Sequence, residues 1–152
     1  MRVEEEITRF LSGGVAAIVA TRDDQLRPQI VRAWGISVAD DGTELTLCVE
    51  AAAGSRTRAN LEANGSVAAT FSQPTTYRTV QIKGERVALA EPSAEQLAAV
   101  EEHLEAFGRE VEQVGMPADA GRRLIDRRLV AMTLAVRELY DQTPGPNAGA
   151  PL

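Results

Sequence analysis

The chain of 152 residues has very few of the residues that build redox, metal or nucleophilic sites, with one cysteine, one histidine and one tryptophan. Cys48 has no cysteine to pair with in the chain, so the fold does not depend on an oxidising compartment. Because Cys48 lies in the apolar run Leu45–Val49, we expect a small buried side chain. One cysteine and one histidine do not make the usual zinc site. His103 lies in a charged helical stretch, which argues against Ser-His-Asp and Cys-His catalysis.

Basic residues and long apolar runs are also scarce. The chain carries 16 Lys and Arg against 22 Asp and Glu, a formal net charge of -6 and a pI of about 4.9. An acidic surface argues against nucleic-acid and anionic-membrane partners, since both need clustered cations. No apolar stretch is long enough to span a bilayer, and the acidic segment 1–11 lacks the pattern of a signal peptide. We therefore expect a cytoplasmic protein with neither kind of partner.

The hydrophobic periodicity predicts a mainly β protein. In chain order it indicates a helix over 3–11, strands over 15–21, 28–38 and 43–50, a helix over 55–63, strands over 67–72 and 76–90, helices over 93–114 and 118–128, and a strand over 129–140. Short strands joined by turns such as Asp40-Asp41-Gly42 favour an antiparallel sheet that closes into a β-barrel with flanking helices. Residues 1–140 form one domain, and the Pro/Gly-rich tail 141–152 is expected to lack regular structure.

Capping and bulge signals refine these elements. Ser55 is the predicted N-cap of the short helix, and Ser93 with Gln96 forms a capping-box pattern for the long one. Gly35 and Gly84 interrupt strands, which is typical of bulges or close backbone approach. The apolar stripe of the long helix comprises Leu97, Val100, Leu104 and Phe107, extended by Val111 and Val114.

Three segments have the residue types of a ligand site. Ser55-Arg56-Thr57-Arg58 combines helix N-terminal amides with a hydroxyl and guanidinium groups, a pattern suited to phosphate; a capped helix with solvated arginines is the alternative. Arg32 lies in the second strand with Trp34 on the same face, where it meets an anion or an exposed carboxylate. In the segment 76–84, one strand face is almost entirely polar, which indicates a wet groove or a solvent-exposed face.

Together these motifs resemble those of the pyridoxamine 5'-phosphate oxidase-like FMN-binding split β-barrel family. The resemblance runs from about Ile7 to Tyr140. Its motifs are Pro-Gln-Ile-Val-Arg-Ala-Trp-Gly at 28–35, Ser-Arg-Thr-Arg-Ala-Asn-Leu-Glu-Ala-Asn-Gly at 55–65 and Tyr-Arg-Thr-Val-Gln-Ile-Lys-Gly at 77–84.

The resemblance implies an antiparallel split β-barrel of the FMN-binding type. It also implies a homodimer with the cofactor groove between subunits, and an FMN-dependent oxidoreductase acting on a small molecule. The positions that match the family's cofactor site serve different parts of the flavin: Arg32 for the ring or phosphate, Trp34 (or Tyr77) for stacking, the backbone of Val49 and Glu50 for the ribityl chain, Ser55, Arg56 and Thr57 for the phosphate, and Thr79 and Gln81 for the ring edge.

Two departures from the family pattern keep other functions open. Many members have a lysine where this chain has Thr57, so a donor remains but a full charge is lost. The tryptophan and arginines that grip the vitamin B6 substrate near the C-terminus are missing, which argues against that reaction. The alternatives are an F420-dependent reductase and a non-catalytic flavin-binding or storage protein. The position of His103, far in sequence from the groove motifs, argues against haem.

Overall fold

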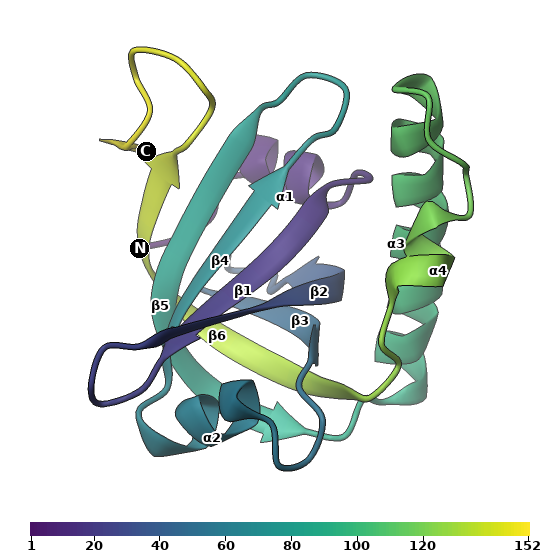
Figure 1. Ribbon diagram of the computed structural model, residues 1–152. Coiled ribbons are helices and arrows are strands. Elements are labelled where there is room, and N and C mark those ends of the chain that lie inside the picture. Colours follow the sequence, from purple (N-terminus) through teal and green to yellow (C-terminus); the bar gives the residue numbers. More distant parts are fainter.

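Six antiparallel strands close into a barrel in the computed structural model, which describes residues 1–152 (Figure 1). The sheet order is β3-β2-β1-β4-β5-β6-β7, and an additional pairing of β3 with β6 closes the ring. The barrel strands are β1 (Ala16–Arg22), β2 (Pro28–Val38), β3 (Glu44–Glu50), β4 (Ser66–Ser72), β5 (Thr79–Ala90) and β6 (Leu129–Asp141). The predicted fold class, a mainly β antiparallel split barrel with flanking helices, is confirmed.

The helices cover the ends and one side of this barrel (Figure 1). α2 (Arg56–Ala63) lies across the lower end and contributes Leu61 to the barrel core, while α1 (Glu5–Leu11) contributes Ile7 and Leu11. α3 (Ala94–Gln113) and α4 (Ala120–Leu124) lie outside the barrel, where α3 packs against β2. None of these helices has the length and apolar character needed to cross a membrane.

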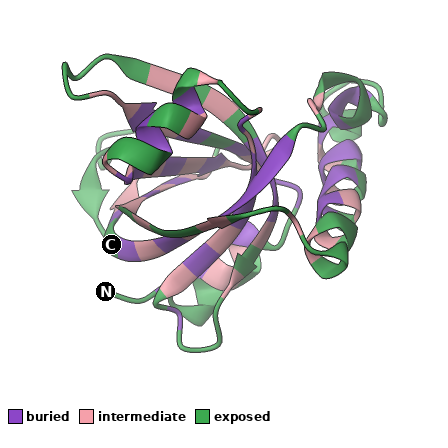
Figure 2. Cartoon of the chain, turned by 90° about the horizontal axis from the view of Figure 1, so that it is seen from below, coloured by how far each residue is buried: buried purple, intermediate pink, exposed green.

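The barrel interior is filled by the inward-facing half of each strand. Side chains alternate across a strand, and the inward set forms a core cluster of 22 buried residues. Figure 2 shows the alternation as buried and intermediate bands along the strands, with exposure gathered at the loops. Complete burial of a large apolar side chain such as Phe71 or Leu47 stabilises the fold by roughly 1.5–3 kcal/mol. The core is therefore enough to hold the barrel without cross-links.

A second apolar cluster attaches α3 and α4 to the outer face of β2, β3 and β6. Its members are Trp34, Cys48, Val100, Leu104, Phe107, Val111, Ala120 and Leu129. Cys48 is fully buried, as predicted, and its burial raises the pKa of the thiol to about 11. The predicted helix stripe is wrong at its two ends, because Leu97 and Val114 are exposed. Leu97 lies in the first turn of α3, and Val114 follows its last residue, Gln113.

Most local signals have the predicted outcome. The Ser55 side chain accepts a hydrogen bond from the Arg58 amide, and Ser93 and Gln96 form the reciprocal capping box. Gly35 has a φ of +63°, in the left-handed region that favours glycine, and the β2–β3 register shifts beside it. An added Cβ at Gly84 would lie 1.9 Å from the Ala135 oxygen, so only glycine allows β5 and β6 to approach there.

Three boundaries differ from the predictions. β5 begins at Thr79 rather than at residue 76, because Tyr77 turns into the left-handed region with a φ of +60°. The helix predicted over 118–128 spans only Ala120–Leu124, and Ile125 is extended. The tail contains a short strand, β7 (Ala150–Pro151), which pairs with Tyr140 and Asp141 of β6. Pro151 has no amide hydrogen, so this edge offers little for further pairing.

Candidate functional site

The first turn of α2 offers hydrogen-bond donors that the chain does not use. Ser55 caps the helix, and the Arg58 amide donates to its hydroxyl at 3.2 Å. Neither the Arg56 amide nor the Thr57 amide donates a hydrogen bond within the chain. A helix N-terminus with free amides and its positive dipole end favours an anion.

Thr57 adds an unusual feature to this turn. Its side chain is 1% exposed, and its Oγ1 is the one buried side-chain oxygen or nitrogen that has no hydrogen-bond partner. A buried hydroxyl without a partner costs about 1–3 kcal/mol. The orphan hydroxyl sits one residue from the free Arg56 amide, so the same turn contains backbone and side-chain groups that lack partners.

Two arginines near this turn are also unpaired. Arg58 forms an ion pair with Glu62 at 3.1 Å, whereas neither Arg32 nor Arg56 takes part in any ion pair. The protein has a net charge of -6 and pairs most of its arginines with carboxylates, so free guanidinium groups are the exception. They are available to an anionic ligand.

A small hollow of about 160 Å³ lies beside the first turn of α2. Asp23, Arg27, Pro28, Gln29, Arg56, Ala59 and Asn60 line it. Arg27 is paired with Asp23 at 2.7 Å, and the Arg27 amide and guanidinium lower the pKa of that carboxyl. Asp23 is therefore ionised and compensated, which leaves Arg56 as the unpaired charge of the hollow.

The β2–β3 register brings part of the predicted set together. Ala33 pairs with Val49, so Arg32 lies beside the end of β3, from which the chain leads through 51–54 to Ser55. Val49 faces the barrel interior and is fully buried, and its backbone lies in the ladder between β2 and β6, so the residue exposes no surface to a ligand. Arg32 is exposed on the outer face of β2.

Trp34 lies on the same side of β2 as Arg32 but is covered by α3. Its ring is 3% exposed, with ring centroids 5.6 Å from His103 and 5.7 Å from Phe107. Its Nε1–H donates to Glu50 Oε1 at 2.9 Å. Both the ring and the N–H of Trp34 therefore contact other residues of the chain.

Thr79 and Gln81 lie apart from this cluster. β1 and β4 separate β2 from β5 in the sheet order. On the outer face of β5, Gln81 donates to Thr70 at 3.0 Å and Thr79 shares a hydrogen bond with Ser72 at 2.9 Å. Within one chain these two residues do not join the α2 turn.

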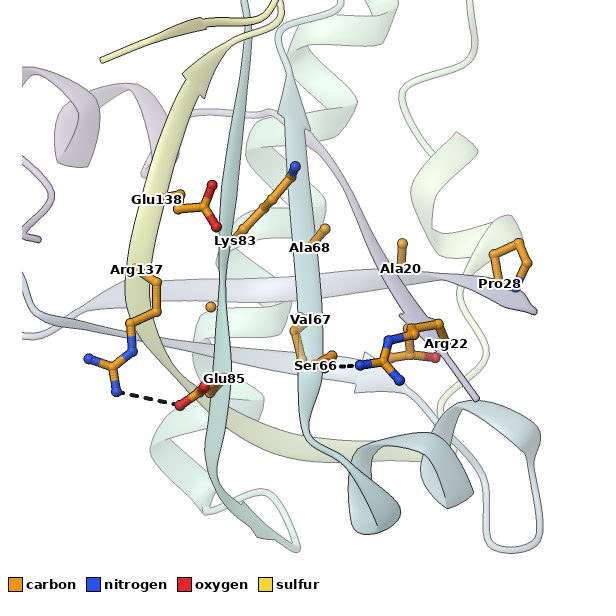
Figure 3. A pocket seen from close by; sticks show the side chains of 12 residues that line it. Ala20, Arg22, Pro28, Ser66, Val67, Ala68, Lys83, Glu85, Arg137 and Glu138 are labelled. Carbon is orange, nitrogen blue, oxygen red and sulfur yellow. Dashed lines mark hydrogen bonds and ion pairs between the residues drawn. The ribbon is translucent and has the colours of Figure 1, made fainter. Parts of the chain in front are cut away.

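The largest concavity, about 560 Å³, lies on the outer face of β1, β4, β5 and β6 (Figure 3). Ala20, Ala68 and Gly84 form part of its floor, and charged side chains stand around it. Figure 3 shows the Arg137–Glu85 pair and the hydrogen bond from Arg22 to Ser66. Beyond this groove on the same face, Ile18 and Ile30 are 37% and 58% exposed. Exposed apolar side chains beside a concave surface are typical of a contact surface.

The single histidine, His103, forms hydrogen bonds to the backbone of two other segments. His103 is 7% exposed; its Nδ1 accepts from the Gly35 amide at 3.0 Å, and its Nε2 lies 2.7 Å from the Val15 carbonyl oxygen. A carbonyl accepts, so Nε2 carries the proton and the ring is neutral. Burial lowers the pKa of His103. With both nitrogens hydrogen-bonded, His103 has no lone pair free for a metal.

Two residues near the site are not evident from the sequence pattern. Arg27 joins Arg56 at the hollow only because the β1–β2 turn folds toward α2. The Asp126 amide donates to Glu50 Oε1 at 3.1 Å, although the two residues are far apart in the chain. Spacing along the sequence contains no signal for either contact.

Comparisons with known proteins identify the fold. The family profile described as pyridoxamine 5'-phosphate oxidase matches residues 3–140, whereas no curated protein sequence matches the chain. An F420 reductase of solved structure is 17% identical with a TM-score of 0.60, over 90% of this chain and 98% of that one. A putative pyridoxamine 5'-phosphate oxidase from Lactobacillus delbrueckii is 12% identical with a TM-score of 0.57, over 91% and 93%. HutZ, a heme storage protein from Vibrio cholerae, is 19% identical with a TM-score of 0.51, over 93% and 95%.

Proposed function

Because the chain belongs to the pyridoxamine 5'-phosphate oxidase family, we propose that it is an FMN-dependent oxidoreductase acting on a small molecule. One observation carries the proposal: the first turn of α2 contains two free amides, a buried hydroxyl without a partner and the unpaired Arg56. These groups fit a phosphate monoester, which accepts several hydrogen bonds at once. A cytoplasmic location goes with the proposal, since the chain needs no disulfide.

Each part of the site has a distinct role in this proposal. The amides of Arg56 and Thr57, the Thr57 hydroxyl and the Arg56 guanidinium hold the phosphate. Arg32, exposed on the outer face of β2 beside the end of β3, serves the flavin ring or phosphate. Bound FMN supplies the redox chemistry, so no side chain has to act as a nucleophile. The protein orients the cofactor and its substrate.

A titration with FMN, followed by quenching of flavin fluorescence, tests the proposal directly. Saturable binding with one FMN per chain, together with substrate-dependent reoxidation of the reduced flavin, is the expected result. A protein that binds no FMN under these conditions contradicts the proposal. Binding with only slow, substrate-independent reoxidation points instead to flavin storage.

F420 is the second candidate, because an F420 reductase shares the fold. F420 continues beyond its phosphate into an acidic tail, and Arg27 lines the hollow beside Arg56. A parallel titration separates the cofactors: an F420 reductase binds the deazaflavin and not FMN. Haem is not favoured, because both ring nitrogens of His103 are already hydrogen-bonded.

Replacing Arg56 by alanine should weaken FMN binding about tenfold or more, since a charge-assisted hydrogen bond contributes roughly 1.5–3 kcal/mol. Arg58→Ala is the matched control. Arg58 lies on the same helix, but its guanidinium is occupied by Glu62, so its loss should change the dissociation constant less than about twofold. Equal effects of the two substitutions, or none from Arg56→Ala, would place the phosphate elsewhere.

A second copy of the chain is the proposed partner. The outer face of β2, β1, β4 and β5 carries the exposed Ile18 and Ile30 beside the small side chains Ala20 and Ala68. Thr79 and Gln81 also lie on this face, so a two-fold arrangement gives them a route to the cofactor of the other subunit. This supports a homodimer with the cofactor groove at its interface.

Ile30→Glu should shift the protein from dimer to monomer, because a buried unpaired carboxylate opposes association by several kcal/mol. Sedimentation velocity measures the change. Leu97→Glu, which alters a similarly exposed apolar residue on α3, should leave the mass unchanged. A wild-type protein that sediments as a monomer at micromolar concentration contradicts the proposed partner, as does an Ile30→Glu variant that remains dimeric.

A further inference from the structure

One carboxylate oxygen joins three separate parts of the fold. Glu50 is the last residue of β3, and its Oε1 accepts from Trp34 Nε1 on β2 at 2.9 Å. The same oxygen accepts from the backbone amide of Asp126 at 3.1 Å. Asp126 lies between α4 and β6. β2, β3 and the α4–β6 connection therefore meet at Glu50.

Both donors are themselves firmly held. The Trp34 ring is packed between His103 and Phe107 of α3. The Asp126 carboxylate accepts from the Arg128 amide at 3.0 Å and from the Arg128 guanidinium at 2.6 Å, which closes a local turn at this residue. A side chain that accepts from two fixed donors is fixed in turn.

Glu50 also immediately precedes the loop that connects β3 to α2. The next five residues, 51–55, lead directly to the free amides of α2. Within this stretch the backbone bonds are local, Ala51 to the Val49 carbonyl at 2.8 Å and Ser55 to the Ala52 carbonyl at 3.0 Å. Glu50 is therefore the last residue before the α2 turn whose side chain ties it to distant parts of the fold.

We propose that Glu50 is a positioning residue for the anion site. By accepting from Trp34 and Asp126, it fixes the start of the 51–55 loop and so the direction in which α2 presents its amides. The inference rests on the proposed function for its ligand, but the positioning itself is a property of the free protein.

Two variants separate the hydrogen bonds from the charge. Glu50→Gln keeps an oxygen that accepts from both donors and removes the charge, whereas Glu50→Ala removes both bonds. Amide hydrogen exchange of the cofactor-free protein reports the loop directly. We expect Glu50→Ala to raise exchange about tenfold at Ala51 and Ser55, the two hydrogen-bonded amides of this stretch, and to weaken FMN binding about fivefold through lost preorganisation. Glu50→Gln should stay within about twofold of the wild type in both measurements.

Val111→Ala is the control for simple loss of stability. Val111 is buried in the same outer cluster on α3, and its truncation destabilises the fold without touching Glu50. It should leave loop exchange and FMN affinity unchanged when measured well below its unfolding temperature.

The outcomes distinguish the positioning role from the proposed function. Wild-type exchange at Ala51 and Ser55 in Glu50→Ala overturns the inference, and so does equal loosening by Val111→Ala. If Glu50→Gln matches Glu50→Ala, the charge matters rather than the hydrogen bonds, and the inference is again wrong. If the wild-type protein binds no FMN, the proposed function fails, while the exchange data still decide whether Glu50 positions the loop.

Discussion

His103→Leu is expected to lower the free energy of unfolding by about 2–4 kcal/mol, because it leaves two buried backbone groups without partners. The Gly35 amide and the Val15 carbonyl both bond to the imidazole, and leucine offers neither an acceptor nor a donor in its place. The histidine joins α3 to two strands at a point where β2 bulges. Urea unfolding followed by the fluorescence of Trp34, which lies against this ring, measures the loss.

The same residue should make stability fall as the pH drops below about 6.5. Burial lowers the pKa of His103 in the folded protein, and the unfolded value is about 6.5. Below about pH 6.5 the unfolded chain therefore binds a proton that the folded protein does not. The stabilisation is complete above that pH and is lost as the pH falls toward the folded pKa, with a slope of at most about 1.4 kcal/mol per pH unit.

His103→Gln supplies the matched control. Its amide offers an acceptor and a donor at roughly the spacing of the ring nitrogens but does not titrate. It should keep part of the stability and lose the fall in stability below about pH 6.5. The carboxyls with lowered pKa, such as Asp126 and Asp23, act at lower pH. An unchanged slope in His103→Gln would mean that another group is responsible.

Gly84→Ala should be the most damaging single-methyl addition to the barrel. The new Cβ would lie 1.9 Å from the Ala135 carbonyl oxygen, which belongs to the backbone of β6 and cannot rotate away. β5 and β6 would have to separate at a bulge of their pairing. We expect a loss above about 3 kcal/mol, beyond ordinary overpacking, or failure to fold, measured by urea unfolding and by soluble yield.

Gly115→Ala tests whether crowding is the cause. Gly115 has nothing within 4 Å of an added Cβ, but its φ is +87°. It should lose only about 1 kcal/mol from the left-handed conformation. Similar losses in the two variants would show that backbone conformation, rather than the close approach of β5 and β6, sets the requirement at Gly84.

The parts of the fold that the sequence predicts are those decided locally. A cap such as Ser55, or the Ser93–Gln96 box, depends on residues within one turn, and both form as predicted. The strand boundaries depend on more. Residues 76–78 continue the alternating pattern of β5, yet Tyr77 leaves the strand in a turn: its amide donates to the Gln73 carbonyl, and the Gln73 amide donates to the Arg78 carbonyl. Gln73 and Thr75 of this turn also donate to Glu110 of α3, and hydrophobic periodicity contains no signal for such a contact.

The short α4 shows the same limit. The helical pattern over 118–128 is broken where Arg122 and Arg127 both pair with Glu101 of α3, and the chain between them straightens toward β6. The sequence shows both arginines, but it does not show that Glu101 is the residue with which they pair. In the tail, hydrogen bonds to Leu139 and Asp141 on β6 create β7 where proline and glycine predict none.

The candidate site divides in the same way. Ser55, Arg56 and Thr57 are adjacent in sequence, so their meeting at a helix start was predictable. Trp34 was predicted to share a face with Arg32, and it does, but α3 covers only the tryptophan. The lack of a partner for the Thr57 hydroxyl, and the hydrogen bond from the Asp126 amide to Glu50, depend on how α2 and α4 pack against the barrel. Such contacts follow from three-dimensional packing, and no spacing rule reports them.

The closure of the barrel through β6 has a consequence for how the protein is made. β1 to β5 can pair as soon as they are synthesised, but the resulting open sheet has two unpaired edges, β3 and β5. Two strands and three helices lie between β3 and β6, and β6 is the strand that covers both edges. Until β6 leaves the ribosome, the nascent chain carries two edges that invite pairing with other chains. Crowded polysomes are therefore where this protein is most exposed to misassembly.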